Sequence, residues 1–307
     1  MDSLEDVWPD QYKANFDKLK TSNSESDYVE ASFNYLRETT IICVILGNSL
    51  RSDDHKNPKK WSRNEAIICG SLLRIAHLLN GFLSEIVNHR METAMIFERS
   101  IYETCINIMY LVKKNDPLVF DEYVKYSLRY EKRLYLEIQG NIAVRGSKLY
   151  IEERMMKSIE NSFLKSRIDM AEIDETARDT WGGSIRKRFK YLNIDHLYDV
   201  LISRVSHTIH GNWQDLLTHY IAYNEDGTFE PKGDSSVPKP QAICAMTTIL
   251  VKTINAFAEW FIDSYSEKEI IIERLDQIDS DVRIIDESHE GYLVRKKERI
   301  EKADIKQ

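Results

Sequence analysis

Apolar residues recur every three or four positions along most of the chain, which is the spacing of one face of an α-helix. Ser62 and Glu65 have the spacing of a capping box, in which two side chains satisfy backbone N–H groups where a helix begins. The apolar stripe that follows them consists of Ile68, Leu72, Ile75, Leu79, Phe82 and Ile86. The pattern therefore predicts a long helix that begins directly after Ser62.

The same periodicity predicts several further helices. A second stripe consists of Phe97, Ile101, Thr104, Ile108 and Leu111. It stops near Asp116, which with Pro117 has the pattern of a new helix start and predicts a helix to about Glu137. The other helices are expected over 27–50, 150–177, 195–210, 212–223 and 241–264. Because no convincing strand pair is visible, the predicted fold class is all-α, a multi-helix bundle.

The patterning also predicts three parts: an N-terminal segment (1–26), a helical bundle domain (27–263) and a charged C-terminal helical tail (264–307). Only 11 glycines and 6 prolines are present, and three prolines lie in a long loop over 224–240. Long loops in compact domains are often functional lids, and a tolerated insertion is the alternative. The sequence leaves both interpretations of this loop open.

The C-terminal tail combines twelve acidic and nine basic residues with an apolar seam. The seam consists of Ile271, Leu275, Ile278, Val282 and Ile285, at the spacing of a coiled coil. Two heptads are short for a free-standing zipper, so docking onto the protein's own body is favoured over it. With either interpretation we expect the tail to be an interaction element, and a protein partner is the expected ligand.

Composition narrows the classes of function. The chain has 307 residues, 42% of them hydrophobic, and a net charge of −8, so no global positive field attracts nucleic acid or anionic membrane. Any RNA binding must come from a local patch. Four cysteines far apart in apolar segments indicate reduced core residues rather than zinc or disulfides: Cys43, Cys69, Cys105 and Cys244. The longest apolar run, 41–46, is too short to span a bilayer, which favours a soluble cytoplasmic protein with no membrane contact.

The segment from Arg204 to Trp213 carries the strongest chemical signal. A guanidinium can hold a phosphate, and a histidine can transfer a proton near neutral pH. Gly211 is a natural helix stop, which would place His210 at the carboxyl end, where a helix favours positive charge. Ser206 lies one turn before His210, and Arg204 lies about a third of a turn away. The segment is therefore a candidate site for phosphodiester chemistry.

Structural interpretations of this segment are also open. His207 and His210 can be a core histidine and a helix cap, with Arg204 in a surface ion pair. A metal site formed by the two histidines and His219 is disfavoured, because no carboxylate or cysteine stands at a matching offset. We expect neither a metal nor a cofactor.

A basic segment and a pair of opposite charges are further candidate features. Arg186, Lys187, Arg188 and Lys190 concentrate positive charge between aromatic residues and form a candidate RNA-binding segment. A solvated basic edge on an amphipathic turn is the alternative. Arg99 and Glu103 are four residues apart, and we expect them to form a structural ion pair along one helix face. Glu98, Arg90 and Arg74 are alternative partners.

Short motifs resemble those of known families. The segment 97–103, Trp181-Gly-Gly-Ser-Ile and the stretch from Tyr198 to Trp213 resemble the bacterial proteins grouped as domain of unknown function 5677, over roughly 65–265. An arginine followed by histidine on a late helix also resembles the HEPN ribonucleases, although Val205 stands where many of them have a polar residue. That resemblance implies a HEPN-like fold in which Arg204 and His210 of two subunits meet and cleave RNA without a metal.

The sequence thus leads to two functional hypotheses. The first is a HEPN-like endoribonuclease of the toxin or antiviral-defence type, acting as a homodimer on RNA. In it His210 transfers protons and Arg204 stabilises phosphorane charge, while Ser206, His207 and Asn212 support the substrate. The second is a non-catalytic helical interaction or regulatory protein in a defence or toxin–antitoxin module. Its working surfaces would be the tail seam and the 224–240 loop.

Overall fold

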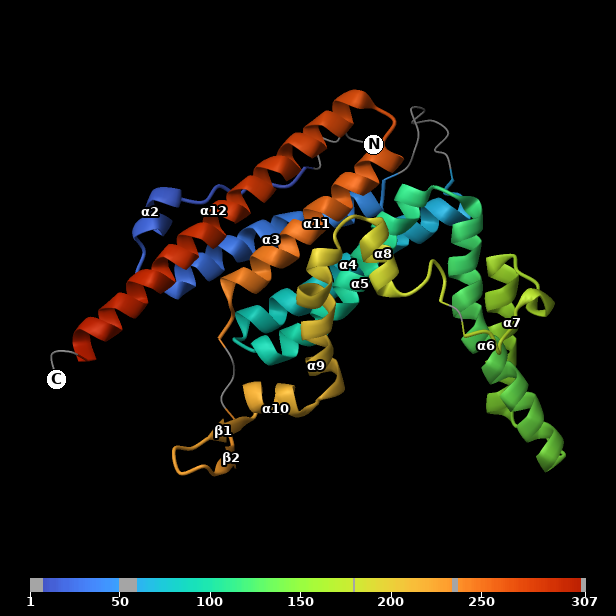
Figure 1. The fold of residues 1–307 in the computed structure, drawn as a ribbon. Helices are drawn as coiled ribbons and strands as arrows, with labels where there is room; N and C mark the ends of the chain where they lie inside the picture. The colour runs from blue at the N-terminus through green and yellow to red at the C-terminus, as the bar shows by residue number, and fades with distance from the viewer. Residues whose placement is uncertain (1–7, 50–59, 179, 234–236, 305–307) are drawn as a thin grey trace. The chain divides into compact units, whose positions relative to one another are not determined.

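The computed structural model describes residues 8–49, 60–178, 180–233 and 237–304. Most of these residues are helical, and the only strands among them form one two-stranded sheet (Figure 1). The prediction of an all-α, multi-helix protein is confirmed. The chain divides into two compact units: unit 1 comprises residues up to Lys113 together with residues from Ile194 onward, and unit 2 comprises Lys114–Asn193.

Unit 1 holds most of the long helices. They are α2 (Phe16–Thr21), α3 (Glu25–Gly47), α4 (Arg63–Val87), α5 (Met91–Lys114), α11 (Pro240–Phe261) and α12 (Tyr265–Asp304). The capping box is confirmed, since Ser62 Oγ accepts from the Glu65 amide at 3.3 Å and Glu65 Oε2 accepts from the Ser62 amide at 2.7 Å. The apolar stripe that follows is buried along α4.

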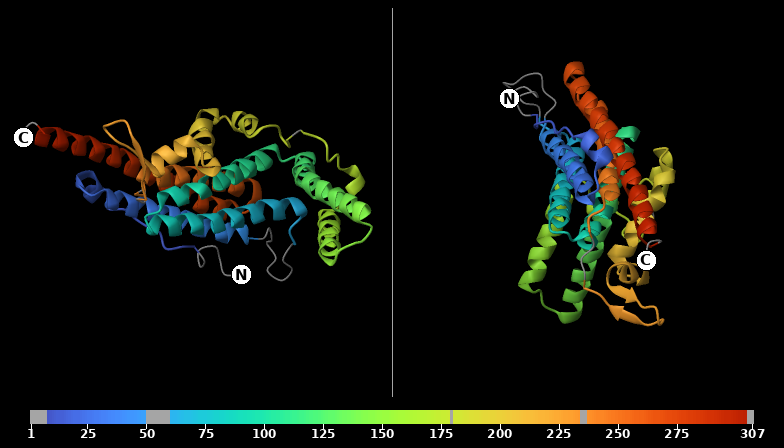
Figure 2. Two further views of the ribbon diagram at one scale, coloured as in Figure 1. Left: turned by 90° about the horizontal axis from the view of Figure 1, so that it is seen from below. Right: turned by 90° about the vertical axis from the view of Figure 1, so that its left-hand side faces the viewer.

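Helix α12 packs on the rest of unit 1. It lies beside α11 and α3 in both sets of views (Figure 1, Figure 2). The five seam residues are at most 1% exposed: Ile271, Leu275, Ile278, Val282 and Ile285. The prediction that the tail docks onto the protein's own body is therefore confirmed. The seam is part of the core, so the expectation that it is a working surface for a partner is wrong.

A buried polar network fixes how α12 docks. Arg274 on α12 donates two hydrogen bonds of 2.7 Å to the carboxylate of Glu38 on α3, and both side chains are almost fully buried, at 6% and 3% exposed. The hydroxyl of Tyr35 donates to Asp281 Oδ2 at 2.6 Å. Bidentate geometry restricts the orientation of both partners, so this pair defines the register of α12 against α3.

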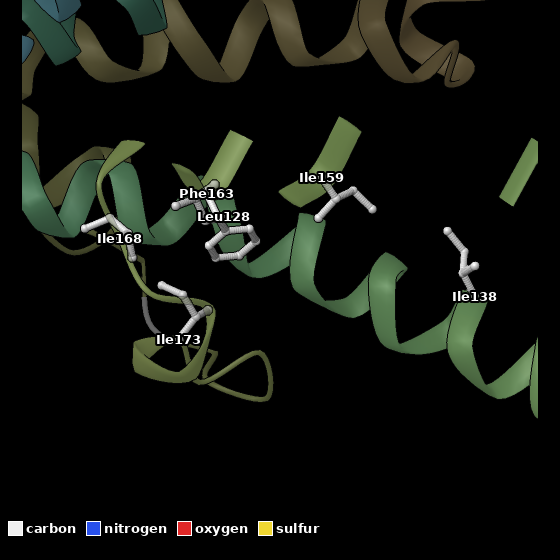
Figure 3. Close-up of a cluster of buried hydrophobic side chains, with 6 residues drawn as sticks. All are labelled: Leu128, Ile138, Ile159, Phe163, Ile168 and Ile173. Carbon is white, nitrogen blue, oxygen red and sulfur yellow. The ribbon is translucent and has the colours of Figure 1, made fainter. Parts of the chain in front are cut away.

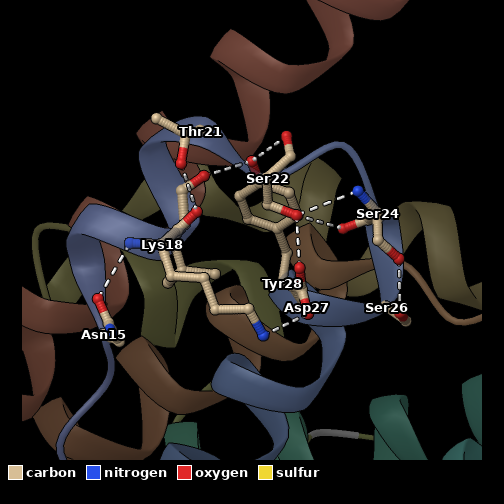
Figure 4. A network of polar contacts seen from close by, with 9 residues as sticks. Asn15, Lys18, Thr21, Ser22, Ser24, Ser26, Asp27 and Tyr28 are labelled. Carbon is tan, nitrogen blue, oxygen red and sulfur yellow. Dashed lines mark hydrogen bonds and ion pairs between the residues drawn. The ribbon is translucent and has the colours of Figure 1, made fainter.

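Polar contacts also tie α2 to the beginning of α3 (Figure 4). The Asp27 carboxylate accepts from Ser22 Oγ at 2.5 Å and from Lys18 Nζ at 2.9 Å. These two hydrogen bonds lower the pKa of Asp27 below its ordinary value. Tyr28 is fully buried and its hydroxyl donates to the Leu19 carbonyl at 2.7 Å. The predicted N-terminal segment is therefore tied to α3 through Lys18, Leu19 and Ser22, while residues 1–7 lie outside the described part.

Unit 2 contains α6 (Pro117–Arg145), α7 (Tyr150–Ser166), the 3₁₀ turn η1 (Met170–Glu172) and α8 (Ile185–Tyr191). The predicted start of α6 is confirmed, because Asp116 Oδ1 accepts from the Leu118 amide at 2.9 Å. The helix continues past the expected end near Glu137 to a left-handed residue, Gly146. The hydrophobic core of unit 2 is formed by α6, α7 and the segment after α7 (Figure 3). Its buried side chains are Leu128, Ile138, Ile159, Phe163, Ile168 and Ile173.

The helix predicted over 150–177 is wrong after Ser166. Arg167 adopts a left-handed conformation with φ 56° and ends α7. The chain then returns to bury Ile168 and Ile173 in the unit 2 core. Burial of these two side chains explains why apolar residues continued beyond the end of the helix.

The region after residue 219 also differs from the prediction. Helix α10 (Trp213–His219) ends before the expected position 223, and β1 (Ile221–Tyr223) pairs antiparallel with β2 (Phe229–Pro231). Gly227 has φ 84°, and Asp226 Oδ1 accepts from the Thr228 amide at 3.0 Å. The first part of the expected 224–240 loop is thus a hairpin turn, whereas residues 234–236 lie outside the described part.

In the part of the chain that the structure describes, two helices, α4 and α11, are long and apolar enough to cross a membrane by length and composition alone. Buried core helices of soluble proteins share this property, and 61% of the apolar window of α11 is buried inside the protein. The four cysteines are free and buried, as the sequence predicts.

Candidate functional site

The segment with Arg204 and His210 lies on a short, irregular helical element of unit 1. A 3₁₀ turn (Asp195–Leu197) leads into a π-helical stretch (Asp199–Ser203), and α9 (Arg204–His210) follows directly. Gly211 is left-handed with φ 53°, and it ends α9 as the sequence predicts. The π-helical stretch was not predicted. Such wider turns are rare and are frequently found at functional sites.

A buried carboxylate holds Arg204 in place. Nη2 of Arg204 donates to Oε2 of Glu98, on α5, at 3.0 Å. Glu98 is fully buried, whereas 46% of the Arg204 side chain is exposed. The guanidinium is thus anchored at one end while much of the side chain contacts solvent. Arg204 therefore does form an ion pair, but with a buried carboxylate and not at the surface as the structural alternative has it. His207 is exposed, so the alternative of a core histidine is wrong for it.

Burial is the main influence on the pKa of Glu98. It raises the pKa of the carboxyl to about 7, although the adjacent Arg204 acts in the opposite direction. The second oxygen, Oε1, has no hydrogen-bond partner among the described residues. Tyr102, one turn further along α5, is also buried, and its pKa lies well above its ordinary value. Carboxyls with strongly raised pKa and a specific charged neighbour are enriched at functional sites.

A second contact joins α5 to α9, and it comes from Arg99, the residue after Glu98 on α5. Arg99 Nη1 donates to Ser206 Oγ, and the same hydroxyl donates to the Ile202 carbonyl at 2.6 Å. Arg99 Nε also donates to Glu103 Oε1 at 2.9 Å, so the expected structural pair is present. Consecutive residues of α5, Glu98 and Arg99, therefore fix Arg204 and Ser206 on α9.

The other predicted site residues lie toward the end of α9. Asn212 Nδ2 is 2.7 Å from His207 Nδ1, and Asn212 also caps α10 by accepting from the Asp215 amide at 3.3 Å. His210 is exposed. Arg204 and His210 are both accessible, but six residues of helix separate their backbones by about 9 Å along the axis.

Glu98 is the main residue that the sequence reasoning did not assign to the site. Its neighbours three, four and seven residues later, Ile101, Tyr102 and Cys105, are all buried. An acidic residue flanked by apolar side chains at these spacings belongs to the buried face of a helix. That pattern is a signal that could have found it, although it does not identify Arg204 as the partner.

The basic segment 186–190 lies on α8 in unit 2. Arg186, Lys187 and Lys190 are exposed. Arg188 is only 7% exposed, and its guanidinium lies 4.2 Å from the centre of the Trp181 ring. Three of the four predicted RNA-binding side chains are thus accessible, and Arg188 packs within the unit.

Within the described residues, no group of three or more histidine, cysteine, aspartate or glutamate side chains is placed to hold a metal ion. Of the three histidines considered for a metal site, His219 is buried, whereas His207 and His210 are exposed on α9.

The fold and this site define an all-α protein in which a buried carboxylate anchors an accessible arginine on a short helix that ends in an accessible histidine. The chain belongs to the family of unknown function DUF5677, whose match covers residues 65–229, just over half of the chain. The matched residues include Glu98, Arg99, Arg204 and His210. No curated protein and no solved structure matches the chain significantly.

Proposed function

We propose that the protein is a HEPN-type endoribonuclease that cleaves RNA without a metal ion. The observation that supports it best is the Glu98–Arg204 pair of 3.0 Å, which positions an accessible cation on the same seven-residue helix as His210. A guanidinium in a fixed orientation can stabilise the charge that develops on a phosphorane. Imidazole is the common side chain for proton transfer near neutral pH.

The proposed reaction uses a nucleophile from the RNA itself. The ribose 2′-oxygen attacks the adjacent phosphorus while a base removes its proton, and the bond from phosphorus to the 5′-oxygen breaks. The leaving 5′-oxygen takes up a proton, so the products are a 2′,3′-cyclic phosphate and a 5′-hydroxyl. His210 would transfer one of these protons and Arg204 would stabilise the phosphorane, with Ser206, His207 and Asn212 around them.

The proposal includes a homodimer. Within one copy, the backbones of Arg204 and His210 lie about 9 Å apart along α9. We propose that the two side chains contact the same phosphate because Arg204 comes from one copy and His210 from the other. Ile209 and Trp213, one residue before and three residues after His210, are 42% and 56% exposed, and we propose that they contribute to the contact between the two copies. A cytoplasmic role in a toxin or antiviral-defence system is the biological setting that fits such an activity.

Cleavage of single-stranded RNA in the presence of EDTA tests the proposal. General acid–base catalysis contributes about 100-fold or more to a rate, so His210→Ala should reduce cleavage by at least that factor. His77→Ala is the matched control, because His77 is an exposed histidine elsewhere in unit 1. Equal activity of the two variants would contradict the assignment of His210.

A non-catalytic role in protein binding is the second candidate, and an exposed aromatic group favours it. Trp213, Tyr223 and Phe229 are 56%, 65% and 54% exposed. The Phe229 ring lies 5.8 Å from the Trp213 ring and 5.1 Å from the Tyr223 ring. Clustered aromatic side chains on a surface are typical of protein interfaces. Loss of self-association or partner binding in Phe229→Ser, without any RNA cleavage by the wild type, would favour this candidate.

A further inference from the structure

Unit 2 is basic although the whole chain is acidic. Residues 114–193 contain 16 Lys or Arg and 13 Asp or Glu, a net charge of +3, whereas the chain carries −8. The remainder therefore carries −11. This division matters because a local positive region can bind phosphate groups even when the protein as a whole repels them.

Part of this charge surrounds a hollow between α6 and the segment 175–178. The hollow has a volume of about 520 Å³, within the usual range of small-ligand sites. Arg129 and Arg133 contribute from one face of α6, and Arg178 contributes from the opposite segment. Arg129 Nη1 also lies 3.5 Å from the Ala177 carbonyl, a contact that links the two walls.

Glu175 is the only carboxylate among the described residues that line the hollow, and it is paired with a lysine. Glu175 Oε2 is 2.9 Å from Lys132 Nζ, and the same ammonium donates to the Ile173 carbonyl at 2.6 Å. Arg133 and Arg178 have no carboxylate partner among the residues that the structure describes. With the Glu175–Lys132 pair counted as neutral, the guanidinium groups of Arg133 and Arg178 give the described lining of the hollow a positive charge.

Aromatic rings complete the lining. Tyr126 and Tyr130 lie one turn apart on α6, with ring centres 6.0 Å apart and nearly perpendicular. The Arg133 guanidinium lies 4.7 Å from the centre of the Tyr130 ring, and Tyr130 remains 56% exposed. Alternating tyrosine rings and guanidinium planes are the surfaces on which proteins stack unpaired bases.

We propose that this hollow binds a nucleoside phosphate, either as a free nucleotide or as a unit of single-stranded RNA. The base stacks on the Tyr130 ring and on the face of the Arg133 guanidinium. The phosphate binds to the N–H groups of Arg133 and Arg178. Hydrogen bonding to a base edge plays no necessary part, so the site accepts different bases. This proposal goes beyond RNA cleavage, because it concerns other residues and requires binding only.

Fluorescence anisotropy with the full chain tests the site. The probe is a fluorescein-labelled 2′-O-methyl oligoadenylate of eight nucleotides, which lacks the 2′-hydroxyl that cleavage needs. Binding is therefore measured whether or not the protein is a ribonuclease. The variants are Tyr130→Ala and the double variant Arg133→Gln with Arg178→Gln. Arg154→Gln is the matched control, because its guanidinium lies 5.8 Å from the Tyr150 ring in the same unit but outside the hollow.

The expected results are specific to each variant. Tyr130→Ala should weaken binding about fivefold or more, the effect of one lost stacking contact. The double arginine variant should also reduce the slope of log affinity against log salt by about 1.4, because each phosphate contact to a single strand contributes about 0.7. Arg154→Gln should bind as the wild type does.

Competition with AMP identifies the source of the ligand. Displacement of the probe by millimolar AMP assigns the site to a free nucleotide, and resistance to AMP assigns it to the RNA chain. Circular dichroism of each variant verifies that the helical fold is intact. No binding by the wild type at low salt would overturn the proposal, and so would equal losses in Arg154→Gln and in the hollow variants.

Discussion

Replacing Glu98 by glutamine should remove a pH-dependent loss of stability. Burial raises the pKa of this carboxyl from 4.5 to about 7 in the folded protein, despite the ion pair with Arg204. A group with a higher pKa in the folded state binds its proton more tightly there than in the unfolded chain. The stability that it contributes is therefore complete below about pH 4.5 and is lost as the pH rises through about 7.

The size of this effect follows from the pKa difference. One pKa unit corresponds to about 1.4 kcal/mol, so a rise from 4.5 to about 7 corresponds to about 3 kcal/mol. Glutamine resembles the protonated acid in shape, keeps an oxygen that can accept from Arg204, and does not ionise. The stability of Glu98→Gln relative to wild type should therefore increase by about 3 kcal/mol between pH 4.5 and pH 8.

Urea unfolding followed by circular dichroism, repeated across this pH range, measures the difference directly. Other carboxyl groups titrate equally in both proteins, so their contributions cancel when the two are compared. Glu103→Gln is the matched control on the same helix, because Glu103 is 39% exposed, and its difference from wild type should stay nearly constant. A Glu98→Gln difference that varies by less than about 0.5 kcal/mol over the range would refute the reasoning.

Two further predictions concern the stability of unit 1. Arg274→Met leaves the buried carboxylate of Glu38 without its cation and should cost about 3–5 kcal/mol in urea unfolding. Arg283→Met removes a pair with an exposed guanidinium from the same helix and should cost less than about 1 kcal/mol; similar losses would contradict the role of the buried pair. Gly70→Ala should stabilise α4 by about 1 kcal/mol, because the added carbon meets nothing within 4 Å. Gly81→Ala should lack this gain in thermal unfolding, since its carbon would lie 2.8 Å from an aromatic ring of α5, and an equal gain would contradict the close packing.

Local signals in the sequence predicted much of the helical framework. The Ser62 capping box, the start of α6 at Pro117 and the end of α9 at Gly211 each depend on residues within one turn of each other. The tail seam was also identified correctly, because its period is that of a helix packed along one face. Each of these features depends only on residues close in the sequence, and not on which distant segments pack against them.

Features that depend on tertiary contacts were not predicted. Glu98 and Arg204 are 106 residues apart, so no local spacing identifies them as a pair. The end of α7 was misplaced, because Ile168 extends the apolar pattern although the chain has already turned back onto the unit 2 core. The π-helical stretch before Arg204 has no sequence pattern of its own that we can identify.

The position of the tail also changes how its role should be tested. Removing residues after 264 would uncover the faces of α3 and α11 that α12 covers, so a truncated chain would lose core packing along with any partner surface. Single substitutions on the exposed face of α12 are therefore the better test of partner binding.

The measurement that tests the central claim most directly is end-group analysis of RNA incubated with the full chain in EDTA. The account predicts fragments with 2′,3′-cyclic phosphate and 5′-hydroxyl ends, no fragments from the same oligonucleotide carrying 2′-O-methyl groups, and none with Arg204→Ala. Cleavage of the methylated strand, the same products from the variant, or intact RNA with the wild type would contradict the assignment of Arg204 and His210 to a ribonuclease site.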